Sequence, residues 1–211
     1  FNRLNKINRE VIALWCEVLR KLPDSRLQMA GMPSDGAPDE LLTWFKEEEI
    51  SEDRLYFYPR SGFVEYLKLH NQVDFCLDTF PYTGGTTTMH ALWMGVPTLT
   101  LIGDTYPSAQ GGAVNNRAGL SQYFIADSQA EFVAKALFLA ENKDILKNIK
   151  YSLRAHMVEN YAGNLEALLN GFDKSVSIAW EKWCKNEKLM NFEIKPEDIF
   201  YKEENTFIQR H

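Results

Sequence analysis

The chain alternates between short apolar runs and longer segments in which apolar residues recur every three or four positions. Short apolar runs are typical of buried strands, and the longer period is typical of helices that pack on one face. Five strands are therefore predicted, at residues 26–30, 54–58, 73–77, 98–102 and 124–126. Residues 1–8 are interpreted as the end of a strand and a short loop.

Helices are predicted between and after these strands. The first has Asn8 as its N-cap and stops before Pro23, because proline cannot continue a helix. A further helix begins at Thr86, and a loop followed by a short helix fills residues 103–119. The first helix spans residues 9–22, and the remaining predicted helices are 41–49, 63–71, 130–140, 143–158 and 164–184.

This alternation of strands and helices favours an α/β fold with a doubly wound parallel sheet. From residue 128 onward the pattern is helical throughout. We expect one domain at residues 1–184, which includes the C-terminal helices. The remaining residues, 185–211, are predicted to form a charged C-terminal extension that Pro196 interrupts.

The most informative stretch lies between the third and fourth predicted strands. A glycine pair, Gly84 and Gly85, precedes three threonines at the expected start of a helix. Glycines let the backbone approach a ligand, and the free N–H groups of a first helical turn bind anions. We therefore expect a phosphate group there, although simple turn glycines and a threonine N-cap would also explain the pattern.

Composition limits the classes of function. With 45% hydrophobic and 25% charged residues, the 211-residue chain is typical of a globular protein. Its net charge of −6 gives no broad attraction to nucleic acid or to an anionic membrane, so a phosphate would be held locally. Three scattered cysteines favour a reduced, cytoplasmic protein. The start at Phe1 without a methionine suggests a fragment.

Several other chemistries lack their sequence patterns. The chain has neither a P-loop nor the G-x-G-x-x-G pattern of dinucleotide sites, and no G-x-S-x-G elbow of hydrolases. Histidines and cysteines are not at zinc-ligand spacing, and no D-x-D metal motif is present. We expect neither a cofactor nor a metal ion.

Four segments resemble one enzyme family. They are FNRLNKI at residues 1–7, NQVDFCLDTFPYTGGTTT at 71–88, ALWMGVPTLT at 91–100 and AWEKW at 179–183. The chain is similar to the O-GlcNAc transferase and SPINDLY group, glycosyltransferase family 41, especially its bacterial members fused to tetratricopeptide repeats. The resemblance implies the Rossmann-like C-terminal lobe of a two-lobed, GT-B-type enzyme.

The resemblance also implies roles for individual residues. Lys6 matches a lysine that neutralises the departing diphosphate, and Arg3 matches a position that reaches the nucleotide sugar. Thr86 and Thr87 match a phosphate-binding pair behind Gly84 and Gly85. A solvated Lys6 or Arg3 is the plainer alternative.

Three further positions would contact the nucleoside. Ser61 lies where backbone atoms read the base edge, Tyr66 could stack on the base, and His90 stands where relatives carry an acid bound to the ribose hydroxyls. Phe63 departs from a family lysine. These residues leave UDP and GDP unresolved, and each could have only a packing role.

The expected activity is transfer of a sugar, GlcNAc in our interpretation, from a nucleoside diphosphate to protein Ser or Thr hydroxyls. Expected partners are the nucleotide sugar, a protein acceptor, a missing N-terminal lobe and tetratricopeptide repeats. The isolated lobe should be inactive. The departures at Phe63 and His90 keep an alternative open, a nucleotide-sugar-binding or scaffold module that has lost turnover.

Overall fold

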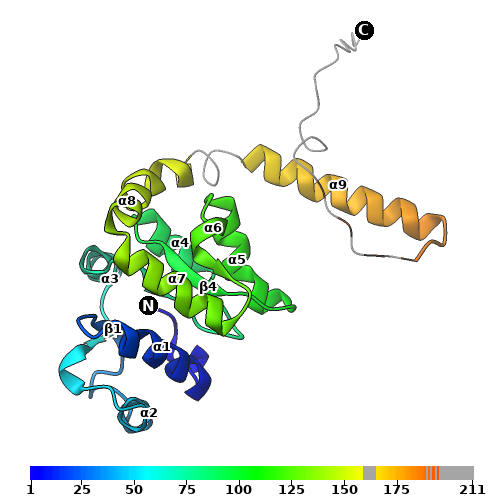
Figure 1. Ribbon diagram of the computed structural model, residues 1–211. Helices are drawn as coiled ribbons and strands as arrows, with labels where there is room; N and C mark the ends of the chain where they lie inside the picture. Colours follow the sequence, from blue (N-terminus) through cyan, green and yellow to red (C-terminus); the bar gives the residue numbers. More distant parts are fainter. Residues whose placement is uncertain (159–164, 189, 191, 193, 195–211) are drawn as a thin grey trace. The chain divides into compact units, whose positions relative to one another are not determined.

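The fold was analysed in a computed structural model, which describes residues 1–158, 165–188, 190, 192 and 194 (Figure 1). The chain divides into two compact units, Phe1–Asn160 and Tyr161–His211. The first unit contains every strand of the described residues. It is therefore the unit that positions the candidate site.

The first part of this unit begins with a short 3₁₀ helix and the helix α1. Asn8 caps α1, because its side chain accepts a hydrogen bond from the N–H of Val11 at 2.9 Å. The apolar face of α1, which includes Ile12 and Trp15, is buried. The elements here are η1 (Leu4–Lys6), α1 (Arg9–Lys21), β1 (Leu27–Met32), α2 (Asp39–Glu47), η2 (Glu52–Arg54) and β2 (Leu55–Pro59).

The second part repeats the alternation of strands and helices and ends in two long helices. Figure 1 shows α7 in front of β4. The elements are α3 (Phe63–Leu69), η3 (His70–Gln72), β3 (Cys76–Leu77), α4 (Thr86–Trp93), β4 (Thr98–Leu101), α5 (Tyr106–Arg117), α6 (Ser121–Phe124), β5 (Ile125–Ala126), α7 (Gln129–Glu141) and α8 (Lys143–Met157).

All described strand pairs are parallel. β1 pairs with β2, with Leu27 opposite Leu55. The other strands form the order β3-β4-β5, with Cys76 opposite Thr98 and Thr100 opposite Ile125. Parallel strands joined by helices confirm the predicted α/β fold.

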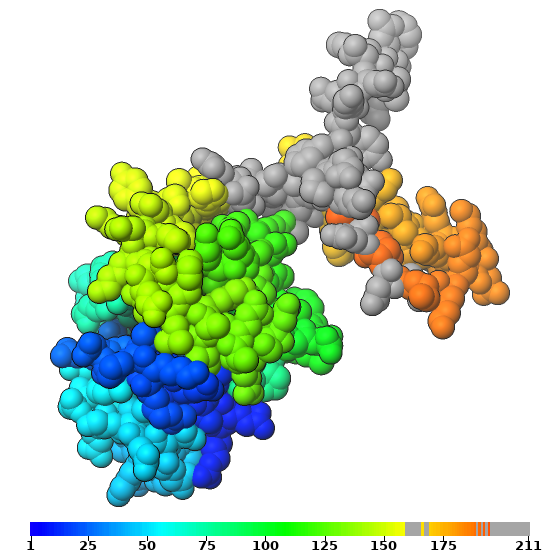
Figure 2. Space-filling view, in the orientation of Figure 1, coloured from blue at the N-terminus to red at the C-terminus, as the bar shows by residue number. Residues whose placement is uncertain are grey.

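The core surrounds β4. Thr100 faces α5, whose Asn115 side chain donates a hydrogen bond to the Thr100 hydroxyl at 3.2 Å. Side chains alternate along a strand, so Leu99 lies on the opposite face, where it is fully buried. α7 also packs on β4 and contributes the buried Phe132 and Leu139. Figure 2 shows the outer surface that α7 and α8 form in yellow-green.

The structure corrects three local predictions. Residues 1–8 contain a 3₁₀ helix rather than the end of a strand. The third strand is only Cys76–Leu77, the two residues that pair with Thr98 and Leu99 of β4. The helix predicted as short within residues 103–119 spans Tyr106–Arg117.

The second unit contains α9 (Leu165–Cys184), which matches the last predicted helix except at residue 164, outside the described residues. Most of the predicted extension at 185–211 also lies outside them, so its boundary stays a prediction. Within the described residues, no helix is both long and apolar enough to cross a membrane.

Candidate functional site

Asp78, directly after β3, organises the glycine-rich loop. Its Oδ1 atom accepts hydrogen bonds from the N–H groups of Thr79 (2.9 Å) and Gly84 (2.8 Å) and from the Asn2 side chain (2.8 Å). Its Oδ2 atom accepts a bond from the Thr100 hydroxyl at 3.0 Å. Burial raises the pKa of this carboxyl group, and the four hydrogen bonds oppose that effect. Asp78 therefore braces the loop instead of facing a ligand.

The loop leads directly into α4. Gly85 is the N-cap residue, and no side chain caps the helix. Thr86 is exposed, whereas the Thr87 hydroxyl donates a hydrogen bond to the Asn2 side-chain oxygen at 2.8 Å. The N–H groups of the first turn have no partner within a helix, and they carry the positive end of its dipole. The mouth of α4 is thus suited to an anion.

Gly84 is required by close packing. A Cβ atom on Gly84 would lie 2.2 Å from the Thr88 hydroxyl oxygen, which is too close for any side chain. At Gly85 the added atom would lie 2.8 Å from the Gln110 amide, which is the far end of a flexible side chain. The first glycine is therefore fixed by its surroundings more strictly than the second.

Lys6 reaches this loop from the start of the chain. Its ammonium group donates a hydrogen bond to the Thr83 carbonyl at 2.8 Å and lies 4.1 Å from the centre of the Tyr82 ring. Burial lowers the pKa of Lys6, and the charge of Asp78 partly restores it. A cation thus lies beside the residues that precede α4. Arg3 is exposed on the same segment, near enough to lower the Lys6 pKa slightly.

Aromatic rings gather beside α4. The His90 ring lies 5.3 Å from Phe63 and 5.7 Å from Tyr66, measured between ring centres. Phe1 stacks on His70 at 3.9 Å. Burial raises the pKa of Tyr66 to about 12 and lowers the pKa of His70 to about 4.

Three polar atoms in this aromatic cluster are buried without a hydrogen-bond partner: the Tyr66 hydroxyl, His70 Nε2 and His90 Nδ1. An unpaired buried polar atom costs free energy, so such atoms in a native structure call for a partner. Ser61 is exposed just before α3, whose first residue is Phe63. Two of the three residues predicted to contact the nucleoside, Tyr66 and His90, thus lie in this cluster.

The next helix holds the loop from its other side. The Thr83 hydroxyl donates to the Pro107 carbonyl at 2.8 Å and accepts from the Gly111 N–H at 2.8 Å. Asp104 is exposed in the loop before α5. Among the described residues, no group of three His, Cys, Asp or Glu side chains is placed to hold a metal ion.

The site therefore combines a helix mouth, a lysine and an aromatic cluster at one end of the parallel sheet. The family model described as glycosyl transferase family 41 matches residues 1–165. The chain belongs to glycosyl transferase family 41. This confirms the resemblance seen in the sequence.

Curated relatives extend the match. Over 190 residues the chain is 30% identical to proteins named "Probable UDP-N-acetylglucosamine--peptide N-acetylglucosaminyltransferase SPINDLY" from Arabidopsis thaliana and from Oryza sativa subsp. japonica. The match covers 89% of this chain but 21% and 20% of those proteins. The chain therefore spans about a fifth of the length of these relatives.

A solved structure supports the fold. The chain superposes on a mutant of an O-GlcNAc transferase from Thermobaculum terrenum with a TM-score of 0.77 and 27% sequence identity. The match covers 88% of this chain and 36% of that one. Membership of family 41 and the α/β fold are thus shown by independent comparisons.

Two residues of the site escaped sequence reasoning. Asn2 joins Asp78 to Thr87, and the Tyr82 ring lies under the Lys6 ammonium group. Neither residue is marked by a motif. Asn2 lies 76 positions before Asp78 in the chain, so the sequence does not show that the two side chains are neighbours. Only the fold brings these side chains to the glycine-rich loop.

Proposed function

We propose that this chain is the donor-binding lobe of a glycosyltransferase that moves GlcNAc from a nucleoside diphosphate to Ser or Thr hydroxyls of proteins. The observation that carries the proposal is the hydrogen bond from Lys6 to Thr83, which holds a cation beside the mouth of α4. The relatives named as peptide N-acetylglucosaminyltransferases support the sugar and the acceptor.

In this reaction the acceptor oxygen bonds to the anomeric carbon of the sugar, and the bond from that carbon to the diphosphate breaks. The electron pair of the broken bond leaves with the diphosphate, which gains negative charge. Lys6 and the N–H groups of the first turn of α4 stabilise that charge. They supply positive charge without a metal ion, and we propose that none is needed.

The Thr86 hydroxyl would supplement the N–H groups as a donor to a phosphate oxygen. The Thr87 hydroxyl donates its proton to the Asn2 side-chain oxygen, so it would have to leave Asn2 to donate to the phosphate as well. Gly84 and Gly85 keep the backbone close to the phosphate. Arg3, exposed near Lys6, would add a second cation toward the donor.

The aromatic cluster would hold the nucleoside. Phe63 is 60% exposed and covers the His90 ring edge-on, so it is able to move aside for a ligand. The unpaired Nδ1 atom of His90 would then accept a hydrogen bond from a ribose hydroxyl. Tyr66 would stack on the base, and backbone atoms near Ser61 would read its edge.

The remaining parts of the enzyme belong to the rest of the polypeptide. We propose that an N-terminal lobe supplies the acceptor groove and the base that takes the hydroxyl proton, and that tetratricopeptide repeats present the acceptor protein. We place the protein in the cytoplasm, where nucleotide sugar and acceptors would meet it. Family membership favours this enzyme over a non-catalytic binding module.

Calorimetric titration of the full-length protein tests the donor site. UDP, UDP-GlcNAc and GDP-fucose are titrated separately, and we expect the UDP compounds to bind. The matched variants are Lys6→Ala, which should weaken binding only modestly, and Lys21→Ala on α1, which should not weaken it. Folded full-length protein that binds none of the three would overturn the proposal, and preference for GDP-fucose would overturn the choice of sugar.

A further inference from the structure

The side chain of Gln110, on α5, covers the residue from which α4 begins. Gly85, the N-cap residue of α4, is buried. A Cβ atom added to Gly85 would lie 2.8 Å from Nε2 and 3.0 Å from Oε1 of Gln110. The Gln110 amide therefore occupies the space that the side chain of an N-cap residue would otherwise take.

This amide has hydrogen-bonding capacity that the chain does not use. A glutamine side chain offers two N–H donors and a carbonyl acceptor. Among the described residues, the Gln110 side chain has no hydrogen-bond partner. It does not cap α4 either, since no side chain does so. The side chain is only half-buried, so its polar atoms are accessible to a ligand.

The backbone on both sides of Gln110 is anchored to the glycine-rich loop. The N–H group and the hydroxyl of Thr83 donate to the Pro107 carbonyl at 3.0 and 2.8 Å. The Gly111 N–H donates to the Thr83 hydroxyl at 2.8 Å. Because these bonds fix α5 against the loop, Gln110 is held over Gly85 without a hydrogen bond of its own.

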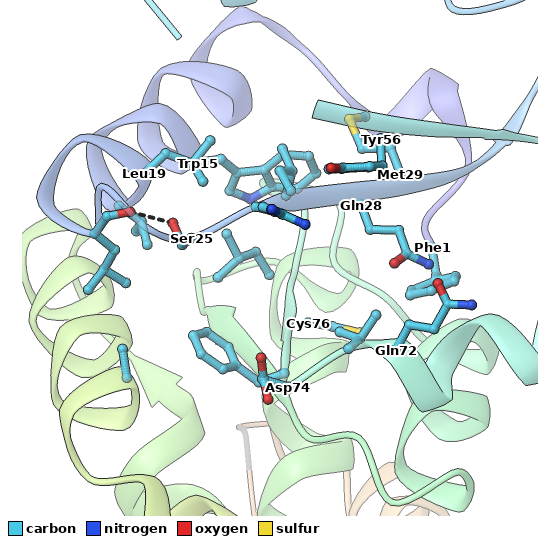
Figure 3. Close-up of a pocket in the computed structure, with 18 of the residues that line it drawn as sticks. Phe1, Trp15, Leu19, Ser25, Gln28, Met29, Tyr56, Gln72, Asp74 and Cys76 are labelled. Carbon is cyan, nitrogen blue, oxygen red and sulfur yellow. Dashed lines mark hydrogen bonds between the residues drawn. The ribbon is translucent and has the colours of Figure 1, made fainter. Parts of the chain in front are cut away.

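The amide does not belong to the cavity between β1 and β3. That cavity has a volume of about 1020 Å³, and the described residues that line it include Met29 and Cys76 but neither Gly85 nor Gln110. Figure 3 shows Met29 on one side of the cavity and Cys76 on the other. The Gln110 amide lies instead at the mouth of α4, where the anion is expected.

Gln110 and the aromatic cluster approach α4 from different helices. The His90 ring packs against Phe63 and Tyr66 of α3, whereas Gln110 belongs to α5. Figure 1 shows α4 between α3 and α5. A nucleotide with its nucleoside in the aromatic cluster would extend its diphosphate across the mouth of α4 toward α5. The phosphate that comes closest to Gln110 would then be the one farthest from the nucleoside, which carries the sugar.

A neutral amide complements the positive charge already present at this mouth. Lys6 and the free N–H groups of α4 supply that charge. An N–H donor that meets a charged oxygen forms a shorter and stronger hydrogen bond than one that meets a neutral oxygen. Since a hydrogen bond has a preferred direction, the Gln110 amide is able to orient the phosphate as well as attract it.

We propose that Gln110 is a further donor-binding residue, whose side-chain N–H group donates a hydrogen bond to an oxygen of the sugar-linked phosphate. The inference rests on the proposed function, because it adds a residue to the same donor site. This phosphate gains negative charge when its bond to the sugar breaks. The hydrogen bond from Gln110 therefore strengthens in the transition state and contributes to the rate of transfer.

Calorimetric titration of the full-length protein with UDP and with UMP tests this inference. UMP keeps the nucleoside and the first phosphate but lacks the phosphate that carries the sugar. We expect Gln110→Ala to weaken UDP binding about 10-fold and UMP binding less than about 2-fold, because it removes one hydrogen bond to a charged group. Gln129→Ala, at an exposed position of α7, is the matched control and should change neither affinity.

Two more variants separate the hydrogen bond from the packing over Gly85. Gln110→Met keeps a side chain of similar length without an N–H donor, so it should weaken UDP binding as much as Gln110→Ala while the melting temperature stays that of the wild type. Gln110→Glu places a negative charge beside the phosphate and should weaken UDP binding further. If Gln110→Ala does not fold, these two variants decide the question.

The results distinguish this inference from the proposed function. Folded wild-type protein that binds no UDP compound would contradict the proposed function and the inference with it. If the wild type binds UDP and both Gln110→Ala and Gln110→Met bind it equally well, the inference alone is overturned. An equal loss of affinity for UDP and UMP also overturns it, because the contact would then lie away from the sugar-linked phosphate.

Discussion

His90 lies against Phe63 and Tyr66, and its Nδ1 atom has no hydrogen-bond partner. If that atom meets a ribose hydroxyl, a carboxylate at the same position would offer two acceptors in place of one. We therefore expect His90→Asp to tighten UDP binding by the full-length protein about 5-fold, close to the strength of one added hydrogen bond. Calorimetric titration measures the change.

The control for this variant is a UDP analogue without ribose hydroxyls. The gain in affinity from His90→Asp should vanish with that analogue. An unchanged affinity for UDP itself would show that the imidazole does not face the ribose.

His70 should make the free energy of unfolding depend on pH. It is fully buried behind Phe1, and burial lowers its pKa from 6.5 to about 4. Between these two pH values the unfolded chain binds a proton that the native chain does not, so the free energy of unfolding should fall as the pH drops from 6.5 toward 4. The expected slope is at most about 1.4 kcal/mol per pH unit.

Urea unfolding between pH 5 and 7 measures this slope. The variant His70→Gln has no titrating group at that position, so its free energy of unfolding should change less over the same range. Equal slopes for the two proteins would contradict the assignment.

At the scale of elements, the connection from β3 to α4 is the most tightly determined part of the chain. Asp78 holds one end of the loop through Gly84, and Thr83 ties it to α5. The sequence identified this strand, loop and helix because glycines and threonines mark the turn chemistry. It could not identify Asn2 and Thr100 as donors to Asp78, because they come from distant positions of the chain.

Replacing Gly84 tests that packing. The variant Gly84→Ala forces a Cβ atom against the buried Thr88 hydroxyl, so we expect it to cost about 1–3 kcal/mol of stability and to weaken nucleotide binding. Thermal unfolding and titration measure the two effects. Gly62→Ala is the matched control, because nothing lies within 4 Å of its added atom. Equal melting temperatures for the two variants would refute the packing argument.

α5 shows where local sequence patterns fail. Gly111 and Gly112 favour a loop on propensity, yet they lie within the helix Tyr106–Arg117. Added Cβ atoms would come within 2.6 Å of Asp78 Oδ2 and 2.5 Å of the Ile102 side chain. These glycines let α5 approach the sheet, a tertiary requirement that the surrounding sequence does not reveal.

At the scale of the whole molecule, the sequence indicated the fold class through its alternation of strands and helices. The division of the sheet between β1 and β3 was not predictable, because pairing depends on what lies beside each strand. The placement of Lys6 was implied by the family resemblance, and its contact with Thr83 was visible only in three dimensions.

The isolated lobe should bind the nucleotide without transferring the sugar. We expect the chain Phe1–His211 to bind UDP more weakly than the full-length protein and to transfer no sugar, because we propose that an N-terminal lobe supplies the base for the acceptor proton. Titration and a transfer assay with labelled UDP-GlcNAc compare the two proteins. Transfer by the lobe alone at a comparable rate would contradict the two-lobe account.

The central claim is that a diphosphate leaves from the mouth of α4 beside Lys6. Steady-state kinetics of the full-length protein with Lys6→Ala, beside Lys21→Ala as the control, tests it most directly. The account predicts that Lys6→Ala lowers kcat by about 100-fold or more and changes the donor KM much less. A kcat for Lys6→Ala equal to that of the control would contradict it.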